Sequence, residues 1–447
     1  MQDRLRSLAP AAILALGWLW FVAYAYPGQI TWDGVDQLAQ ARRGVYSDDQ
    51  PPVFIAIWHA LDVVVNGPLL MLLLQAAAFT AGLYLVFRRT FAPLHAAIAT
   101  TAIFVFPPVM TAMALVWKDN LMAGLLVLAI GLLLQDTTPG RRRVMLRGAA
   151  IVAMFVATAV RYNAAAATFV PILFMPWRAS LAGVKRYAVA VGVWLAITAA
   201  ALLTNAALTD NEMSQWHTTI AVFDIAGTIA HVDDPISDAE LADDLAGSEC
   251  LIDRDIQAAA RAVYSSSDYF KVISNDPRAL WHVPVFTAPS EAQRDGIAHA
   301  WKRVVWKHPV AWLEHRFAVM REVLTTDTAV QWRGEMKPDK QPERARMGLL
   351  VEWEPYQLAW TRRFRWLEKH TPLFAPWLYL VLALSLIPFA WRHRDLLVLV
   401  LSGLGYEASF VLLACSHDYR YSHWMIVTTC VAAVALTARR RRAKVAA

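Results

Sequence analysis

The sequence has few charged residues and few cysteines for a chain of its length. Of 447 residues, 17% are Asp, Glu, Lys or Arg, and three are cysteines. Soluble domains average about a quarter charged residues, so this low charge argues against a soluble protein. The three cysteines settle little. A bond between Cys250 and Cys415 remains a minority interpretation.

Motifs of several common protein classes are also missing. The sequence has no Walker loop, dinucleotide fingerprint, Gly-x-Ser-x-Gly elbow or zincin motif. It shows neither an internal repeat nor a low-complexity segment. These absences argue against the usual nucleotide-binding and hydrolase folds. The lack of repeats also weighs against a transporter, although that alternative stays open.

Long hydrophobic runs are abundant: 57% of the residues are hydrophobic, and 19 are Trp. Runs of transmembrane length lie at 8–25, 67–87, 94–116, 119–136, 187–208, 373–391, 396–414 and 422–438. A further run, 147–177, is interrupted by Arg161-Tyr162-Asn163 and is interpreted as two short helices meeting at a polar turn. The sequence therefore predicts an all-α polytopic membrane protein with about ten spans. The first run is alternatively a signal peptide, because Ala23-Tyr24-Ala25 resembles a cleavage site.

Basic residues concentrate on one side of these spans. Clusters such as Arg141–Arg143 and Arg439–Arg442 share that side with both termini. By the positive-inside rule this side is cytoplasmic. The net charge of +6 is thereby explained by orientation and anionic lipid, and no nucleic-acid partner is predicted.

The polar segments divide the chain into three parts. Residues 1–208 form an N-terminal membrane module that includes a juxtamembrane outer loop, 26–66. Residues 209–371 are too polar to span and too long to be a connection, so they predict a mostly helical extracytoplasmic domain. Residues 372–447 form a C-terminal membrane module.

The first outer loop holds four carboxylates: Asp33, Asp36, Asp48 and Asp49. Carboxylates next to a bilayer are costly, so they indicate a functional site. Residues 37–43 predict a surface helix that Gly44 ends, and 53–61 predict a second one. Asp36 is also explained as a helix cap, whereas Asp33 is the preferred functional residue.

Other outer turns carry cations. Lys118 and Asp119 lie between the third and fourth spans, Arg161 and Asn163 in the next outer turn, and Asp418 and Arg420 in the last. Separated cations suit a phosphate-bearing ligand, although Lys118–Asp119 and Asp418–Arg420 can also be local ion pairs. The nearby His417 and His423 match no specific metal-ligand spacing. A divalent metal is not indicated, and no cofactor is firmly implied.

The pattern Trp32-Asp33-x-x-Asp36, then Gly44, then Asp49-Gln50-Pro51-Pro52, resembles the first outer loop of the GT-C membrane glycosyltransferases. That superfamily uses polyprenyl-phosphate sugars and includes protein mannosyltransferases and lipid A aminoarabinose transferases. The best-known members often carry Asp-Glu in this loop, where this sequence has Asp33-Gly34. The resemblance implies a GT-C-type fold in a bacterial cytoplasmic (inner) membrane. The active site would face the extracytoplasmic side.

The resemblance also implies roles for the outer residues. Asp33 and Asp119 would be catalytic, while Asp36, Lys118, Arg161, Asn163, Asp418 and Arg420 would bind substrate. The implied reaction transfers a sugar, with inversion, from a polyprenyl-phosphate donor to a glycan, lipid or protein acceptor. Two alternatives remain: a non-enzymatic lipid or solute transporter, and a polysaccharide polymerase or ligase that would depend on His315 and Arg316.

Overall fold

Helices dominate the structure. The computed structural model describes residues 2–135, 140–174, 183–273, 279–281, 289–331, 333–334 and 336–446. Within these ranges there are no strands, only isolated β-bridges such as Gln29 to Leu115. The prediction of an all-α membrane protein is confirmed.

In the described part of the chain, six helices are long and apolar enough to cross a membrane: α1 (Gln2–Ala25), α4 (Leu69–Arg88), α8 (Arg141–Val160), α10 (Val184–Leu208), α20 (Arg394–Leu413) and α21 (His423–Ala446). Helices α5 (Pro93–Phe104) and α6 (Pro107–Met113) are apolar enough together but are bent by 70° at Phe106-Pro107, the geometry of a broken span or of a re-entrant loop. The other predicted spans correspond to shorter helices, α7 (Lys118–Leu134), α9 (Ala164–Phe174) and α19 (Pro376–Ala390). Residues 175–177, the end of one predicted span, lie outside the described residues.

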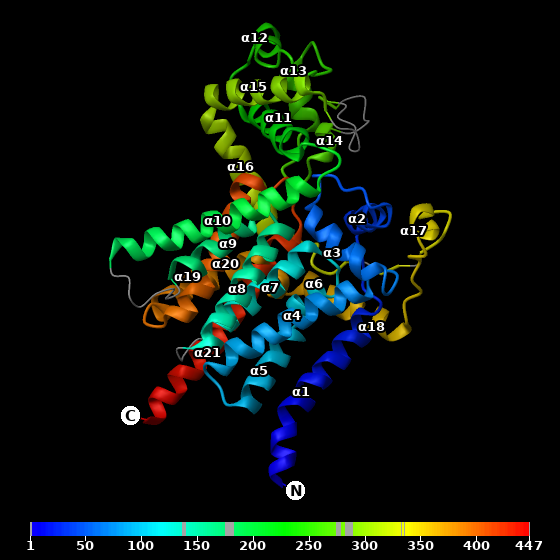
Figure 1. Ribbon diagram of the computed structural model, residues 1–447. Coiled ribbons are helices and arrows are strands. Elements are labelled where there is room, and N and C mark those ends of the chain that lie inside the picture. Colours follow the sequence, from blue (N-terminus) through cyan, green and yellow to red (C-terminus); the bar gives the residue numbers. More distant parts are fainter. Residues whose placement is uncertain are drawn as a thin grey trace.

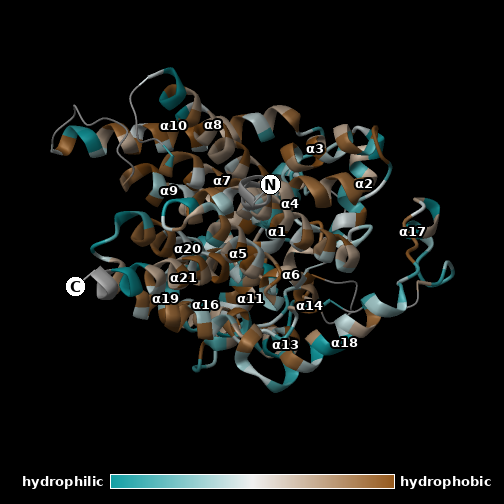
Figure 2. Cartoon of the chain, turned by 90° about the horizontal axis from the view of Figure 1, so that it is seen from below, coloured by the Kyte–Doolittle hydropathy of each residue, from teal (hydrophilic) through white to brown (hydrophobic). Residues whose placement is uncertain are grey.

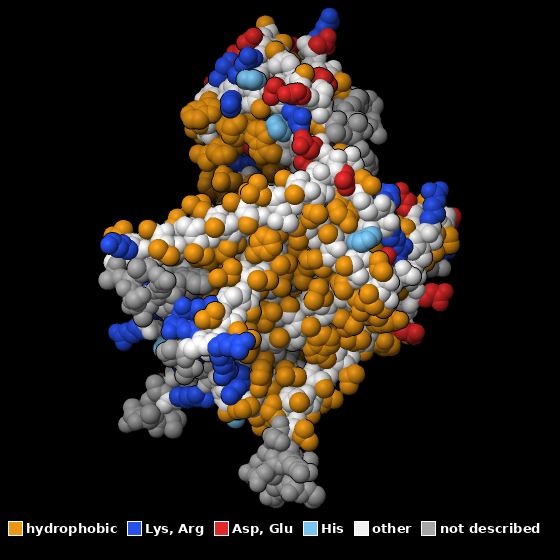
Figure 3. Space-filling view, in the orientation of Figure 1, with side chains coloured by type: hydrophobic (Ala, Val, Ile, Leu, Met, Phe, Trp, Pro, Cys, Tyr) orange, Lys and Arg blue, Asp and Glu red, His pale blue; other side chains and the backbone are white. Residues whose placement is uncertain are grey.

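The surface agrees with this arrangement. Apolar side chains cover the middle of the helical body, basic side chains gather near the end that carries both termini, and acidic ones lie toward the opposite end (Figure 3). Viewed from below, the spanning helices are largely hydrophobic, whereas α18 is more hydrophilic (Figure 2). The chain is a multi-pass membrane protein.

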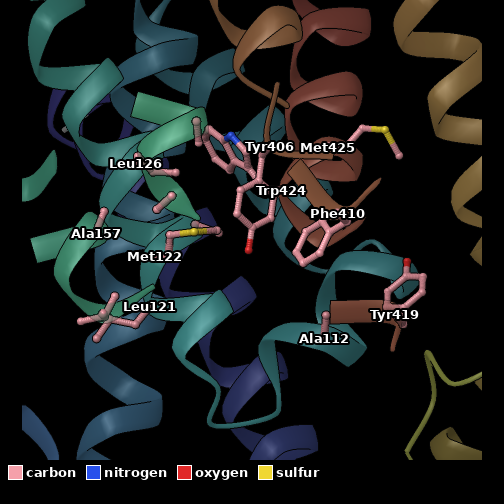
Figure 4. Close-up of a cluster of buried hydrophobic side chains, with 14 of the residues drawn as sticks. Ala112, Leu121, Met122, Leu126, Ala157, Tyr406, Phe410, Tyr419, Trp424 and Met425 are labelled. Carbon is pink, nitrogen blue, oxygen red and sulfur yellow. The ribbon is translucent and has the colours of Figure 1, made fainter. Parts of the chain in front are cut away.

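Close helix packing fixes α7, whose first turn carries Lys118 and Asp119. A methyl group at Gly82 of α4 would overlap the backbone of Leu128, and one at Gly124 would lie 2.8 Å from the Gln75 carbonyl oxygen. Glycines thus let α4 and α7 approach backbone to backbone, as in other membrane helix pairs. Deeper in the body, buried side chains of α6, α7, α8, α20 and α21 pack together (Figure 4).

Two short helices lie at the outer end of the body. Helix α2 (Trp32–Arg43) begins five residues before the predicted 37–43 segment and ends at Gly44, whose φ of 66° explains why glycine is needed there. Helix α3 (Pro52–Asp62) follows. The predicted pair of juxtamembrane helices is therefore present, with Asp33 in the first turn of α2.

Beyond them, six helices form a head above the body (Figure 1): α11 (Val222–His231), α12 (Asp238–Asp244), α13 (Ile256–Val263), α14 (Phe270–Ile273), α15 (Glu291–Lys307) and α16 (Pro309–Leu324). The Ser237 side chain caps α12 by accepting from the Glu240 amide at 3.3 Å. The chain then leaves the head through α17 (Pro342–Arg346) and α18 (Pro355–His370). Helix α18 lies against α1, where Trp20 and Trp360 make an edge-to-face contact.

Candidate active site

Six of the eight predicted site residues converge on one buried cluster at the outer end of the body. They come from the start of α2, the start of α7, the break between α8 and α9, and the turn before α21: Asp33, Lys118, Asp119, Arg161, Asp418 and Arg420. Each sits where a helix begins or ends, because a polar side chain can face its partners there without interrupting a span.

Arg420 is at the centre of the cluster. Its Nη1 lies 2.8 Å from Oδ2 of Asp33, and its Nε lies 3.0 Å from Oδ2 of Asp418. The guanidinium also stacks over the Trp117 ring at 5.3 Å. The expected Asp418–Arg420 pair is present, and Arg420 additionally links it to Asp33.

Asp119 belongs to a second group. Its Oδ1 lies 3.0 Å from Nε of Arg161 and accepts a hydrogen bond from the Tyr406 hydroxyl at 3.0 Å. The predicted alternative of a local Lys118–Asp119 ion pair is not formed, because Arg161 takes that carboxylate. Asp119 is 1% exposed, and its Oδ2 has no hydrogen-bond partner within the described ranges. A free buried acceptor of this kind can take a hydrogen bond from a ligand hydroxyl.

Lys118 is the cation whose charge is least neutralised. It is 5% exposed, and its Nζ donates to Oε1 of Gln50, which also accepts from Nε2 of Gln37 at 2.8 Å. No carboxylate of the described chain pairs with it directly. A buried ammonium with an amide as its partner is suited to an incoming anion.

The carboxylates of α2 differ in acidity. Burial opposes ionisation of Asp33, but Arg420 and Lys118 outweigh it and hold the pKa of Asp33 below its ordinary value. Asp36 lies one turn on and hydrogen-bonds to Gln40 at 2.7 Å. Burial, and then the charge of Asp49, raise the pKa of Asp36. Asp33 is therefore the more fully ionised acid at neutral pH.

The head holds the turn that carries Asp418 and Arg420. Arg316 of α16 donates to the Ala414 carbonyl at 2.9 Å, and Nδ1 of His417 lies 2.8 Å from the Ser267 carbonyl oxygen. The Tyr419 amide donates to Oγ1 of Thr328 at 3.2 Å. Residues far apart in sequence therefore fix the position of Arg420.

Two of the predicted residues have other partners. Asn163, in the turn before α9, donates to Oγ of Ser409 of α20 at 3.2 Å. Asp36 contacts its own helix rather than Arg420. Glu407, the acid inside a predicted span, accepts from Ser422 at 2.7 Å.

Three residues of the cluster are absent from the sequence-based site: Gln50, Trp117 and Tyr406. Gln50 lies within the first-loop motif and Trp117 directly precedes Lys118, so sequence proximity is a usable signal for them. Tyr406 sits beside Glu407 on α20, and no sequence pattern distinguishes which of the two faces Asp119.

Across the described ranges, no group of three or more His, Cys, Asp or Glu residues is arranged to hold an ion. His423 is buried and stacks on Phe79, with ring centroids 6.3 Å apart, while His417 is held by Ser267.

Comparison with known proteins yields one structural similarity. No protein-family model matches the chain, and no curated protein matches its sequence. Among solved structures, the chain is similar to ArnT from Cupriavidus metallidurans bound to undecaprenyl phosphate. The identity is 14%, the TM-score is 0.37, and the alignment covers 93% of this chain and 77% of ArnT. Function is therefore inferred from the geometry of the site.

Proposed function

We propose that the protein is a GT-C-type membrane glycosyltransferase that moves a sugar from a polyprenyl-phosphate donor to a cell-envelope acceptor. The observation that carries the proposal is the buried cluster in which Asp33 lies beside Arg420, Lys118 and Arg161. It combines a carboxylate for the attacking hydroxyl with cations for the departing phosphate. The first-loop motif, which resembles that of the GT-C enzymes, supports the same reading.

In the proposed step, an acceptor hydroxyl oxygen bonds to the anomeric carbon of the donor sugar. The bond from that carbon to the phosphate oxygen breaks, and the electron pair leaves with polyprenyl phosphate. Asp33 orients the hydroxyl and takes its proton, while Asp119 accepts a hydrogen bond from the acceptor through its unpaired Oδ2. Attack opposite the leaving group inverts the anomeric configuration.

The three cations have unequal roles in this scheme. Arg161 is paired with Asp119, and Arg420 is shared by Asp33 and Asp418. Lys118 has only the Gln50 amide as its partner, so of the three cations it can bind the donor phosphate most readily. The phosphate would replace the neutral amide oxygen of Gln50 by a negatively charged one, so that both partners of the hydrogen bond carry charge.

The orientation follows from the same distribution of charge. We place the site at the extracytoplasmic face of a bacterial inner membrane. The 26–66 loop and the 209–371 segment lie outside. The membrane modules 1–208 and 372–447 cross the membrane, and both termini are cytoplasmic. The basic end of the body supports this assignment, whereas the head carries both acidic and basic side chains (Figure 3). Lipid-linked sugars are the activated donors suited to that face.

The alternative functions have less support. A polymerase or ligase that depends on His315 and Arg316 needs these side chains to be accessible, yet they are 0% and 1% exposed. Arg316 pairs with Asp224 at 2.6 Å, and His315 lies 3.2 Å from the same carboxylate. A transporter needs polar groups along a path, whereas the cluster lies at one end of the body.

Lys118→Ala tests the proposal. Purified protein in nanodiscs should bind undecaprenyl phosphate, and Lys118→Ala should weaken that binding at least about tenfold through loss of a charge-assisted contact. Lys307→Ala, a lysine of the head that is paired with Asp244, is the matched control and should bind like the parent. Equal affinity of all three proteins would contradict the assignment of the phosphate site.

A further inference from the structure

A second polar feature lies on the other side of the loop that precedes α2. A cavity of about 580 Å³ is bounded by the loop from Pro27 to Ile30, by Gly67 and Pro68, and by the segment around α17. Ile30, in its wall, is three residues before Asp33. The cavity therefore adjoins the proposed active site without including Lys118, Arg161 or Arg420.

Arg344 of α17 faces this cavity. It is 9% exposed, and within the described residues the one hydrogen bond of its side chain runs from Nη2 to the Ile30 carbonyl at 3.0 Å. No carboxylate of the described residues is within ion-pair distance. Burial without a compensating acid lowers the pKa of Arg344. Burying a guanidinium in this way is costly unless an anion joins it.

A second arginine lies directly behind the cavity wall. Arg333 is 4% exposed and donates to Oε1 of Gln29 at 3.2 Å and to the Tyr24 carbonyl at 2.6 Å. Its guanidinium stacks on Trp353, which lines the cavity, at 4.7 Å. The Nη2 atom has no partner in the described part of the chain. Two buried guanidinium groups thus share one region, and among the described residues no carboxylate pairs with either of them.

By contrast, Arg42, which also lines the cavity, already has an ion-pair partner and a hydrogen-bond partner. Its Nε lies 2.8 Å from Oδ2 of Asp62, and its Nη1 donates to the Met347 carbonyl at 2.7 Å. This contact ties α2 to the segment after α17, so the cavity has a fixed wall. The charge that remains to be matched belongs to Arg344 and Arg333.

We propose that this cavity binds an oxyanion, a phosphate or a carboxylate, that is carried by the sugar acceptor. The inference rests on the proposed transferase function. An anionic group anchored at Arg344 would hold the acceptor beside the start of α2, where its hydroxyl can reach Asp33. An arginine fork recognises either oxyanion through paired hydrogen bonds, so the site selects for acceptors that carry one.

Titration calorimetry with two soluble probes, glycerol 1-phosphate and glucuronate, tests the inference on the full-length protein in nanodiscs. We expect at least one probe to bind and Arg344→Ala to weaken it about tenfold or more. The probe that binds more tightly identifies the acceptor group. Arg346→Ala removes an exposed charge from the same helix and should leave the affinity unchanged.

Binding of undecaprenyl phosphate separates this inference from the proposed function. Arg344→Ala should leave that binding intact, whereas Lys118→Ala should weaken it and spare the soluble probe. Arg344→Lys keeps the positive charge but not the paired donors of the guanidinium. It should weaken probe binding by an intermediate factor, so the inference can still be tested if the alanine variant unfolds. The inference is overturned if neither probe binds the parent protein, or if Arg344→Ala abolishes undecaprenyl phosphate binding.

Discussion

Replacing Asp33 by Asn should remove most of the transfer activity while leaving the protein folded. Asn keeps the size of the side chain and one oxygen that can accept from Arg420 at the present 2.8 Å. It cannot take a proton. Arg420 also retains Asp418 at 3.0 Å, so the substitution does not leave a buried guanidinium without an acid.

For Asp33→Asn, the expected loss of stability is much smaller than the expected loss of activity. The Asp33 side chain is 34% exposed, so solvent screens its pair with Arg420, and the loss should cost about 0–1 kcal/mol of stability. Losing a general base costs about 10²–10⁴ in rate. Arg420 and Lys118 hold the pKa of Asp33 low, which makes it a weaker base, so we expect a loss near the lower limit, about 10². Because Asp33 stays ionised, the loss should be the same at pH 6 and pH 8.

The assay measures sugar transfer from a polyprenyl-phosphate donor, with thermal unfolding recorded on the same preparations. Asp395→Asn is the control: Asp395 also pairs with an arginine, Arg439, at 3.0 Å, but it lies in the first turn of α20, three helical turns before Tyr406, and contacts no residue of the cluster. It should keep parental turnover. Parental turnover in a folded Asp33→Asn protein would refute the catalytic role, and Asp119→Asn would then be the next variant to measure.

Two further predictions concern the stability of the regions around the site. A methyl group at Gly227 would overlap the imidazole of His315, so Gly227→Ala should lower the free energy of unfolding by about 1–3 kcal/mol, whereas Gly192→Ala, where the space is open, should not; equal melting temperatures would contradict this packing. Burial raises the pKa of Glu368 in α18 to about 7 from a model-compound value of 4.5. The pKa of Glu368 is higher in the folded protein than in the unfolded chain. Its contribution to the free energy of unfolding is therefore complete below about pH 4.5 and is lost as the pH rises through 7. Glu368→Gln should therefore flatten the fall in melting temperature between pH 5 and pH 8, and an unchanged profile would contradict it.

The sequence predicts the helices well where the signal is local. The break at Phe106-Pro107, the αL end of α2 at Gly44 and the cap at Ser237 all depend on residues within one turn, and all are present. Helix α2 begins five residues before the predicted segment: Trp32 and Asp33 have modest helix propensity, but Val35 and Leu38 are buried in the core and the helix packs against α3.

The pairing within the site could not be predicted in the same way. Asp119 and Lys118 are neighbours in sequence, yet Asp119 pairs with Arg161, because the tertiary packing of α7 against α8 brings that residue to it. Tyr406 reaches Asp119 from 287 residues away. The cavity next to Arg344 depends on where the chain runs after it leaves the head, which hydrophobic periodicity does not encode.

The contact between Arg316 and the Ala414 carbonyl limits how the protein can be re-engineered. The same guanidinium holds Asp224 within the head, so one side chain is shared by the head and by the turn that carries Arg420. A hybrid enzyme made by grafting a foreign head onto this body would lose the contact between Arg316 and the Ala414 carbonyl even if both halves folded. Swapping heads to change the acceptor would therefore also have to transplant residues 414–420, which makes the turn, rather than the domain boundary, the natural place to cut.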